Sequence, residues 1–484
     1  MEKKNVCLIH SFPFGTKSPY VIHVDGIMPK LMYLFTLSSF RGLQSFSFTC
    51  LDMSQTVKEV AITITTKMNN LPPVSTECCI YRVPEKFRRA NVEAYTPQVI
   101  SIGPFHRDNT ELQSSEEIKL RYLKGFLRRI RADLLACTRM IRESEDCIRQ
   151  CYQENLTQGS DELVEMILVD ADFVVELFIR NHYVEHRDEN DEIYSKQWMS
   201  NGVFHDILLL ENQVPFFVLE NLYNLTALRT TVTFFKLSYE YFKEVLHGHE
   251  LASTRVQVKH LVDYVRALQL PLFARGVMSK QVKKFELTRS AKELKEAGVK
   301  FRRGEGTSSV LDVVFKDGTL EMPRVVVHEW TEVYFRNMIA YEQCHHEYKY
   351  ISSCAILMDS LINMPEDIDI LIGCGILENQ LGSTDAVASL INGMYRETMR
   401  DSSKFLYSSQ CESLNMYGRT RWHRMKAAWY QWRVILKRDY FSNPWSGVSV
   451  VTAVVLVVLT LVQTACSFLD FYAGDTWRLF RRRK

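Results

Sequence analysis

Four acidic residues in two apolar segments are the strongest candidates for catalysis. Asp170 and Asp172 lie in the segment ILVDADFVVELF, and Asp206 and Glu211 lie in HDILLLEN. Paired carboxylates can act as general acid and base in glycoside hydrolysis, or can bind a divalent cation. Residues two apart on a helix point in different directions, so Asp170 and Asp172 would diverge. We therefore expect these acids to cap helices or to pair with arginines, and we keep a hydrolase as the alternative.

The other chemical motifs are incomplete. His328 and Glu329 begin a zinc-binding HExxH pattern, but Glu332 occupies the place of its second histidine. His345 and His346 are adjacent, so on a helix their rings would point about 100° apart and chelate a metal poorly. The chain has no Walker A motif, no GxSxG and no complete glycine-rich dinucleotide motif. We therefore predict no metal site and no cofactor, and we favour a protein without enzymatic activity.

Two helices are predicted in the region of the first acid pair. Apolar residues recur at three- and four-residue spacing from Leu120 to Ile141, behind a capping box of Ser114 and Glu117. This pattern predicts one long amphipathic helix, and its other face would expose Arg128, Arg129, Arg131, Arg139 and Arg142. A second helix is expected from Asp161 to Arg180, with Ser160 as its N-cap.

The remaining pattern is helical, with one β-unit. Pro215 should begin a new helix directly after the second acid pair. The segment Gln98–Ile102 is expected to be a short strand or extended chain. Asp317 and Gly318 predict a hairpin turn that joins Val310–Phe315 to Leu320–Met322, with Val325–His328 following. We therefore predict a mainly α fold, in which one large helical domain over residues 77–439 contains a small β-hairpin unit.

A single uncharged stretch near the C-terminus predicts a membrane anchor. No charged residue occurs from Tyr440 to Leu469, and the run Gly447–Leu469 is apolar. A bilayer core needs about 20 apolar residues at a rise of about 1.5 Å each. We therefore predict a single transmembrane helix over residues 445–469, followed by a short basic tail over 470–484. The residues that we assign to this membrane anchor are Trp445, Gly447, Leu456, Leu461 and Leu469.

A basic collar precedes this stretch. It consists of Arg419, Arg421, Arg424, Lys426, Arg433, Lys437 and Arg438, interleaved with tryptophans. Such a segment beside a membrane is typical of contact with anionic lipid. The positive-inside rule then favours a cytosolic position for the large domain, although the tail is also basic. With 59 basic and 57 acidic residues in the whole chain, we expect no nucleic-acid partner.

The cysteines and the N-terminus add two expectations. The 12 cysteines are dispersed without any CxxC pair, which favours reduced core residues on a cytosolic face. The glycosylation sequons at Asn155 and Asn224 would matter only if the domain were luminal. Residues 1–76 are interpreted as a leader, either disordered or an extension of the gene model, with Met53 as the natural start.

Several segments together resemble one plant family. They are ECCIYRVPEKFRRANVEAYTPQVISIGPFHR, LLLENQVPFFVLENL, AKELKEAGVKFRRG, LDVVFKDGTLEMP and TEVYFRNMIAYEQC, followed by the late apolar run. In this order, from about Glu77 to Leu469, they are similar to the plant domain-of-unknown-function 247 family. The resemblance implies a chiefly helical domain with one C-terminal membrane span and no established biochemical activity. It also implies a link to recognition, since some members are associated with pollen–stigma self-recognition in grasses.

Three functional hypotheses follow. The favoured one is a single-pass, C-terminally anchored membrane protein that acts by protein–protein recognition or signalling, with the lipid bilayer and an unidentified protein as partners. The second is a membrane-anchored hydrolase that uses Asp170, Asp172, Asp206 or Glu211. The third is a receptor-like domain that is partly luminal or extracellular. The sequence leaves the oligomeric state open.

Overall fold

The computed structural model describes residues 57–70, 76–130, 133–226, 228, 232–246, 257–270, 286–304, 309–394, 404–419, 429, 432–433, 435 and 444–481. The chain divides into two compact units, Met1–Val74 and Ser75–Lys484. In the first unit the described part is a helix over residues 57–69. The predicted leader over residues 1–76 is thus helical over 57–69, and its first 56 residues, including the expected start at Met53, lie outside the described residues.

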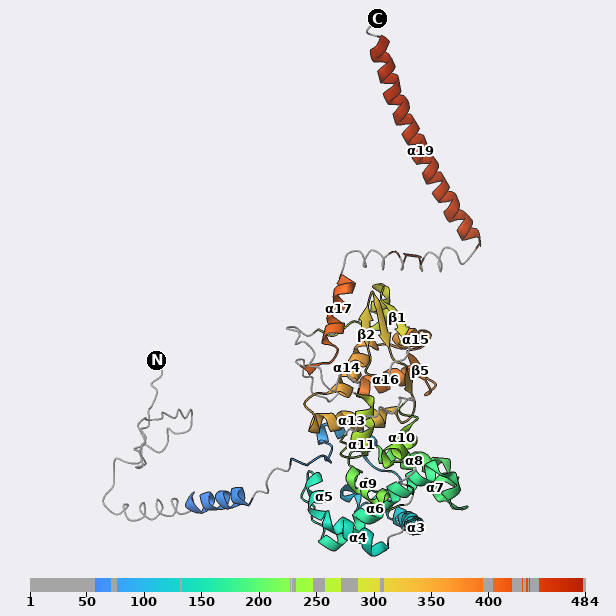
Figure 1. Ribbon diagram of the computed structural model, residues 1–484. Coiled ribbons are helices and arrows are strands. Elements are labelled where there is room, and N and C mark those ends of the chain that lie inside the picture. Colours follow the sequence, from blue (N-terminus) through green and yellow to red (C-terminus); the bar gives the residue numbers. More distant parts are fainter. Residues whose placement is uncertain are drawn as a thin grey trace, which may run out of the picture. The chain divides into compact units, whose positions relative to one another are not determined.

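One half of the second unit is built around the central helix α6 (Ser160–His182). Helices α3 (Ser114–Leu127), α4 (Leu134–Glu143), α9 (Phe216–Asn224) and α10 (Phe234–Phe242) pack against it (Figure 1). Every residue from Leu163 to Arg180 except Glu165 is buried, as expected for a helix with neighbours on all sides. The predicted helix is therefore confirmed, but its N-cap is Gly159. The Ser160 hydroxyl instead contacts Glu145 and Arg142.

The first long helix of the prediction is two helices in the structure. α3 ends at Leu127, and α4 begins after Asp133, whose side chain accepts a hydrogen bond from the Ala136 N–H at 2.9 Å. The predicted capping box is also wrong, because Gln113 is the N-cap of α3 and no side chain caps the helix.

The buried face of α3 differs from the predicted one. It consists of Ser115, Lys119, Tyr122, Gly125 and Phe126, whereas Leu120 is exposed. The inward face is polar because it meets charged partners on α6, and hydropathy alone does not reveal such partners.

Shorter elements connect this half to the rest of the unit. They are α2 (Glu85–Arg88), α5 (Glu145–Cys151), α7 (Glu192–Ser195), α8 (Gln197–Ile207) and the 3₁₀ turns η1 (Glu93–Tyr95), η2 (Pro104–His106), η3 (Thr110–Leu112) and η4 (Val184–His186). Helix α9 begins directly after Pro215, so the predicted split at this proline is confirmed.

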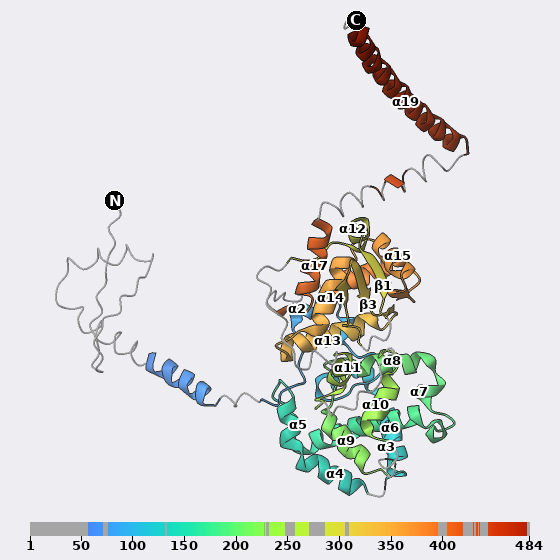
Figure 2. The same cartoon turned by 45° about the horizontal axis from the view of Figure 1, so that its top comes forward.

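The other half contains the later helices and the strands (Figure 2). The helices are α11 (Leu261–Gln269), α12 (Ala291–Glu296), α13 (Thr331–His345), α14 (Tyr350–Leu361), α15 (Pro365–Gly373), α16 (Thr384–Met394) and α17 (Ser408–Arg419). Helix α13 contacts α11, α14, α16 and η1, so it joins the two halves.

A three-stranded sheet has the order β1 (Lys300–Arg303), β3 (Thr319–Met322), β2 (Val314–Lys316). The hairpin β2–β3 turns at Asp317 and Gly318, which both have positive φ, so the predicted turn is confirmed. The predicted first strand is too long, because Val310 and Leu311 lie in a turn within the core.

Two parallel strand pairings were not predicted. β1 pairs with β3, and β4 (Val325–Val327) pairs with β5 (Leu377–Asn379). The described chain is thus mainly helical with a few short strands.

Helix α19 (Pro444–Arg481) is described separately, because its side chains are described only for residues 448–449 and 451–467. Among the residues assigned to the anchor, Leu456 and Leu461 are exposed on it, and the side chains of Trp445 and Leu469 lie outside the described set. Gly447 belongs to the same helix. Across the described portion of the chain, no helix combines the length and apolar character that crossing a bilayer requires.

Two residues of the basic collar are described. Arg419 ends α17 and pairs with Glu286 at 2.8 Å, and Arg433 is helical and exposed. The other five, Arg421, Arg424, Lys426, Lys437 and Arg438, lie outside the described residues.

Candidate functional site

An irregular segment over residues 98–103 binds two of the candidate acids, Asp206 and Asp170. Asp206 Oδ1 accepts the Gln98 N–H at 2.8 Å, and its Oδ2 accepts the N–H groups of Val99 and Ile100 at 2.6 and 2.8 Å. Buried N–H groups need acceptors, and a carboxylate is a strong one. The segment is neither helix nor strand: it bends at Gln98 and Val99, which brings three consecutive N–H groups onto one carboxylate, so the predicted short strand is not present.

Asn212 and Asp170 extend the same arrangement. Asn212 Oδ1 accepts the Ile102 N–H at 2.7 Å, and Asp170 Oδ2 accepts the Gly103 N–H at 2.8 Å. A Cβ at Gly103 would lie 2.6 Å from the Gln213 carbonyl oxygen, and its φ is +74°, so only glycine fits there. The segment is thus fixed by side chains from α6, from α8 and from the chain after α8.

Asp170 also forms a fully buried ion pair. Lys119 Nζ contacts Asp170 Oδ1, and it donates to the Ser101 carbonyl oxygen at 2.9 Å. Both side chains of the pair are 0% exposed. Burial raises the pKa of Asp170 above its ordinary value, and the attraction of Lys119 opposes that rise. Lys119 and Asp170 therefore connect α3 to α6 and to residues 98–103.

Glu211 is surrounded by cations. Its carboxylate accepts the Val83 N–H at 2.7 Å and contacts Arg88, Arg82 and His106, the last two at 3.3 and 3.1 Å. Burial alone would raise the pKa of Glu211, but the hydrogen bond from His106 and the charge of Arg88 hold it below the usual value. Glu211 therefore remains ionised and binds the chain at residues 82–88.

Asp172 has the opposite surroundings. Its side chain is 0% exposed, and neither carboxyl oxygen has a hydrogen-bond partner among the described residues. Burial, reinforced by the nearby charge of Glu176, raises its pKa well above the usual value. Burial therefore favours the neutral form of the Asp172 carboxyl group over its charged form.

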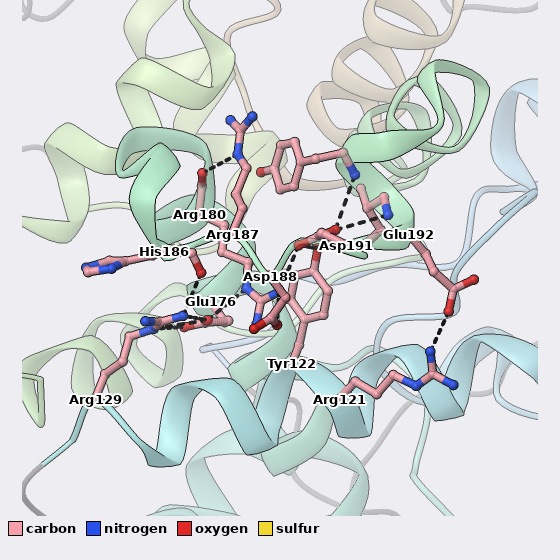
Figure 3. A network of polar contacts seen from close by, with 12 residues as sticks. Arg121, Tyr122, Arg129, Glu176, Arg180, His186, Arg187, Asp188, Asp191 and Glu192 are labelled. Atoms are coloured by element: carbon pink, nitrogen blue, oxygen red, sulfur yellow. Dashed lines mark hydrogen bonds and ion pairs between the residues drawn. The ribbon is translucent and has the colours of Figure 1, made fainter.

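A second polar network lies around Glu176 and Arg180 of α6 (Figure 3). Glu176 accepts hydrogen bonds from Arg129 Nη2 at 2.7 Å and from Arg180 Nε at 2.8 Å. Arg180 Nη1 then reaches Asp191 at 2.7 Å, and its guanidinium lies 4.2 Å from the centre of the Tyr122 ring. Arg129 is thus half-buried in a network, which corrects the prediction of a solvated arginine.

Three of the four candidate acids bind other parts of the protein, and Asp172 has no hydrogen-bond partner among the described residues. Asp170 pairs with Lys119 of α3, Asp206 binds residues 98–100 and His205, and Glu211 binds residues 82–88 and His106. All four side chains are at most 1% exposed, so their carboxyl groups are covered by protein. This geometry favours the predicted structural roles, and it offers a substrate no open pair of carboxylates among these four residues.

The histidine motifs also have packing roles. His345 accepts or donates a hydrogen bond with the Tyr81 hydroxyl at 2.8 Å and stacks on Tyr341. It is half-buried, whereas a surface position was expected for this pair. Across the described residues, no group of three or more His, Cys, Asp or Glu side chains is arranged to hold a metal ion.

Sequence reasoning missed Lys119 and Arg180 as organising residues. Lys119 falls on one helical face with Ser115, Tyr122 and Phe126, which could have placed it inward. Its partner Asp170 is far away in the sequence, so the pattern alone could not pair them. Gln213 was interpreted as structural, and it donates to the carbonyl oxygens of Ile207 and Leu209 at 2.7 Å each.

Comparisons with known proteins identify the family of this chain. A family model described as plant protein of unknown function, domain 247, matches residues 80–459. The UPF0481 protein At3g47200 of Arabidopsis thaliana is 29% identical over 423 residues, which cover 81% of this chain and 87% of the relative. The putative UPF0481 protein At3g02645 of the same plant is 22% identical over 501 residues, covering 82% and 92%. No solved structure matches. The chain therefore belongs to the plant domain-of-unknown-function 247 family.

Proposed function

We propose that this chain is a single-pass, C-terminally anchored membrane protein whose helical body acts by protein–protein recognition or signalling. The observation that carries the anchor is the surface of α19. Ten of its valines and leucines are between 51% and 65% exposed: Val448, Val451, Val454, Val455, Leu456, Val457, Val458, Leu459, Leu461 and Val462. Leaving such side chains in water costs about 1.5–3 kcal/mol each relative to burial. A bilayer would remove that cost.

The dimensions of the apolar run support the same proposal. Gly447–Leu469 contains no charged residue. As a helix with a rise of about 1.5 Å per residue, this run is about 34 Å long, which matches a hydrocarbon core of about 30 Å. A helix also satisfies its own backbone groups, as lipid requires.

The chain before α19 supports an interfacial role for the basic collar. Trp429 and Trp432 are 72% and 71% exposed, and Arg433 beside them is exposed as well. Tryptophan and arginine together favour the headgroup region of a membrane with anionic lipid. On the positive-inside rule, this collar favours a cytosolic position of the body.

The body itself supports recognition more than catalysis. All four candidate acids are buried, and Asp170, Asp206 and Glu211 bind α3, residues 98–103 and residues 82–88. Such a rigid interior can present a fixed outer surface to a protein partner. The partner would be found by proximity labelling from the native membrane.

The anchor is tested with charged substitutions in α19. The full-length protein should remain with membranes after alkaline carbonate extraction, whereas V455K/V458K should be released into the supernatant. Each lysine near the centre of a membrane helix costs about 2.5–3.5 kcal/mol. The matched control V455L/V458L should stay in the pellet. Release of the unaltered protein would refute the anchor, and protease protection of intact vesicles would then decide the side on which the body of an anchored protein lies.

A further inference from the structure

The start of the body is paired with the end of α5 through backbone hydrogen bonds. The N–H groups of Cys79 and Ile80 both donate to the Cys151 carbonyl oxygen at 2.9 Å, and the Gln153 N–H donates to the Ile80 carbonyl oxygen at 2.9 Å. Ile80 and Tyr152 form a parallel bridge. Cys79 and Cys151 directly precede these bridged residues, so they lie opposite one another on adjacent segments.

This placement has the geometry that a disulfide needs. Facing residues on hydrogen-bonded segments lie about 5 Å apart, and disulfides join Cα atoms that are about 4.4–6.8 Å apart. Both cysteines are free thiols, and their side chains are 0% and 8% exposed. No large backbone movement is therefore needed to join them.

The two thiols also differ in acidity. A hydrogen bond between them raises the pKa of Cys79 and lowers the pKa of Cys151. The positive charge of Lys259 further favours a thiolate at Cys151. Because the thiolate is the nucleophile, Cys151 is the residue that reacts first, and it is also the less buried of the two.

We propose that Cys79 and Cys151 are a disulfide-forming pair, which covalently joins the start of the body to α5 when the protein meets a low-molecular-weight disulfide such as oxidised glutathione. The Cys151 thiolate attacks one sulfur of the oxidant and expels one small thiolate, which leaves a mixed disulfide. Cys79 then loses its proton and attacks the Cys151 sulfur, expelling the second small thiolate. In total, the protein loses two electrons and two protons, and the oxidant becomes two thiols.

Two nearby cysteines provide internal comparisons. Cys147 is exposed one helical turn before Cys151, so an oxidant that reaches α5 should modify it. Cys137 of α4 is buried, and it is not opposite another cysteine in any described strand or bridge. The cysteines were expected to be reduced core residues, and Cys79 and Cys151 are both free and buried. Folding places these two residues, which are far apart in the sequence, opposite one another.

The test uses the full-length protein in native membranes or detergent, treated with oxidised glutathione, blocked with N-ethylmaleimide and digested without reductant. Mass spectrometry should find a peptide in which Cys79 is linked to Cys151, together with glutathione on Cys147. C79S should accumulate glutathione on Cys151, because the resolving thiol is missing, and C137S should form the link as the unaltered protein does. Modified Cys147 without any Cys79–Cys151 link in the unaltered protein would overturn the proposal, as would a Cys79–Cys147 link in its place. These outcomes do not depend on whether α19 is a membrane anchor. A failure of this proposal can therefore be distinguished from a failure of the anchor in the carbonate extraction.

Discussion

Removing the positive charge of Lys119 should destabilise the body strongly. Lys119 is fully buried between α3 and α6, where it pairs with Asp170 and donates to the Ser101 carbonyl oxygen. In K119M the methionine fills a similar volume, but the carboxylates of Asp170 and Glu116 and the Ser101 carbonyl oxygen lose this partner. Breaking a buried ion pair on one side costs about 3–5 kcal/mol. We therefore expect K119M to lower the free energy of unfolding by about that amount.

Lys124 of the same helix offers a matched control. It is exposed, so K124M should change the free energy of unfolding by no more than about 0.5 kcal/mol. The double variant K119M/D170N should lose less than K119M, because the asparagine carries no charge and can still accept the Gly103 N–H. Urea unfolding of the full-length protein in detergent, followed by tryptophan fluorescence, measures all three differences.

The pH dependence of K119M provides a second readout. Burial already raises the pKa of Asp170 in the native state, and loss of Lys119 should raise it further. A raised native pKa means that the folded state binds the proton more tightly, so stability falls as pH rises above the unfolded value of about 3.9. The deficit of K119M should therefore be smaller at pH 4 than at pH 7. A loss below about 1 kcal/mol at pH 7, or a deficit that grows in acid, would refute the proposed role of the pair.

Three further substitutions test the other contacts. D206A should unpair three amides at a cost of about 1–3 kcal/mol for each group left unsatisfied, and hydrogen exchange of these amides should accelerate; unchanged exchange would contradict the assignment. G125A should lower the midpoint of thermal unfolding, because the added Cβ would lie 2.4 Å from Arg180 Nη2. The control G373A should leave the midpoint unchanged, because a Cβ there would have no atom within 4 Å. Equal midpoints for the two variants would show that Arg180 moves aside. E211Q should be less stable than the parent at pH 7. Because the native pKa of Glu211 is lowered, that difference should shrink as pH falls through it, and a difference independent of pH would argue against the charge.

Local sequence signals predicted several elements correctly. Helix α9 begins directly after Pro215, which is its N-cap and cannot lie within a helix because it lacks a backbone N–H. Asp317 and Gly318 form the hairpin turn because both adopt positive φ. These features depend on residues within a few positions of one another, so the chain itself contains all the information needed.

The inward face of α3 could not be predicted in this way. Leu120 looked like a core residue and is exposed, while Lys119 is buried. A lysine is stable inside only if a partner meets it, and the partner comes from α6. The same reason explains why Arg129 was assigned to solvent and why the parallel strands β1 and β5 were missed, since each depends on a segment that is distant in sequence.

The sequence by itself determined the family, the mainly helical character and the uncharged run on which the anchor proposal depends. These follow from local composition, periodicity and motif order. Only the tertiary structure decided what the acids do. It places Asp206 against three amides, Asp170 against Lys119, and Asp172 in a site without a partner among the described residues. It also places Cys79 opposite Cys151. The physical reason is that the role of a buried polar group depends on the group that it contacts. These contacts depend on how segments distant in sequence pack together.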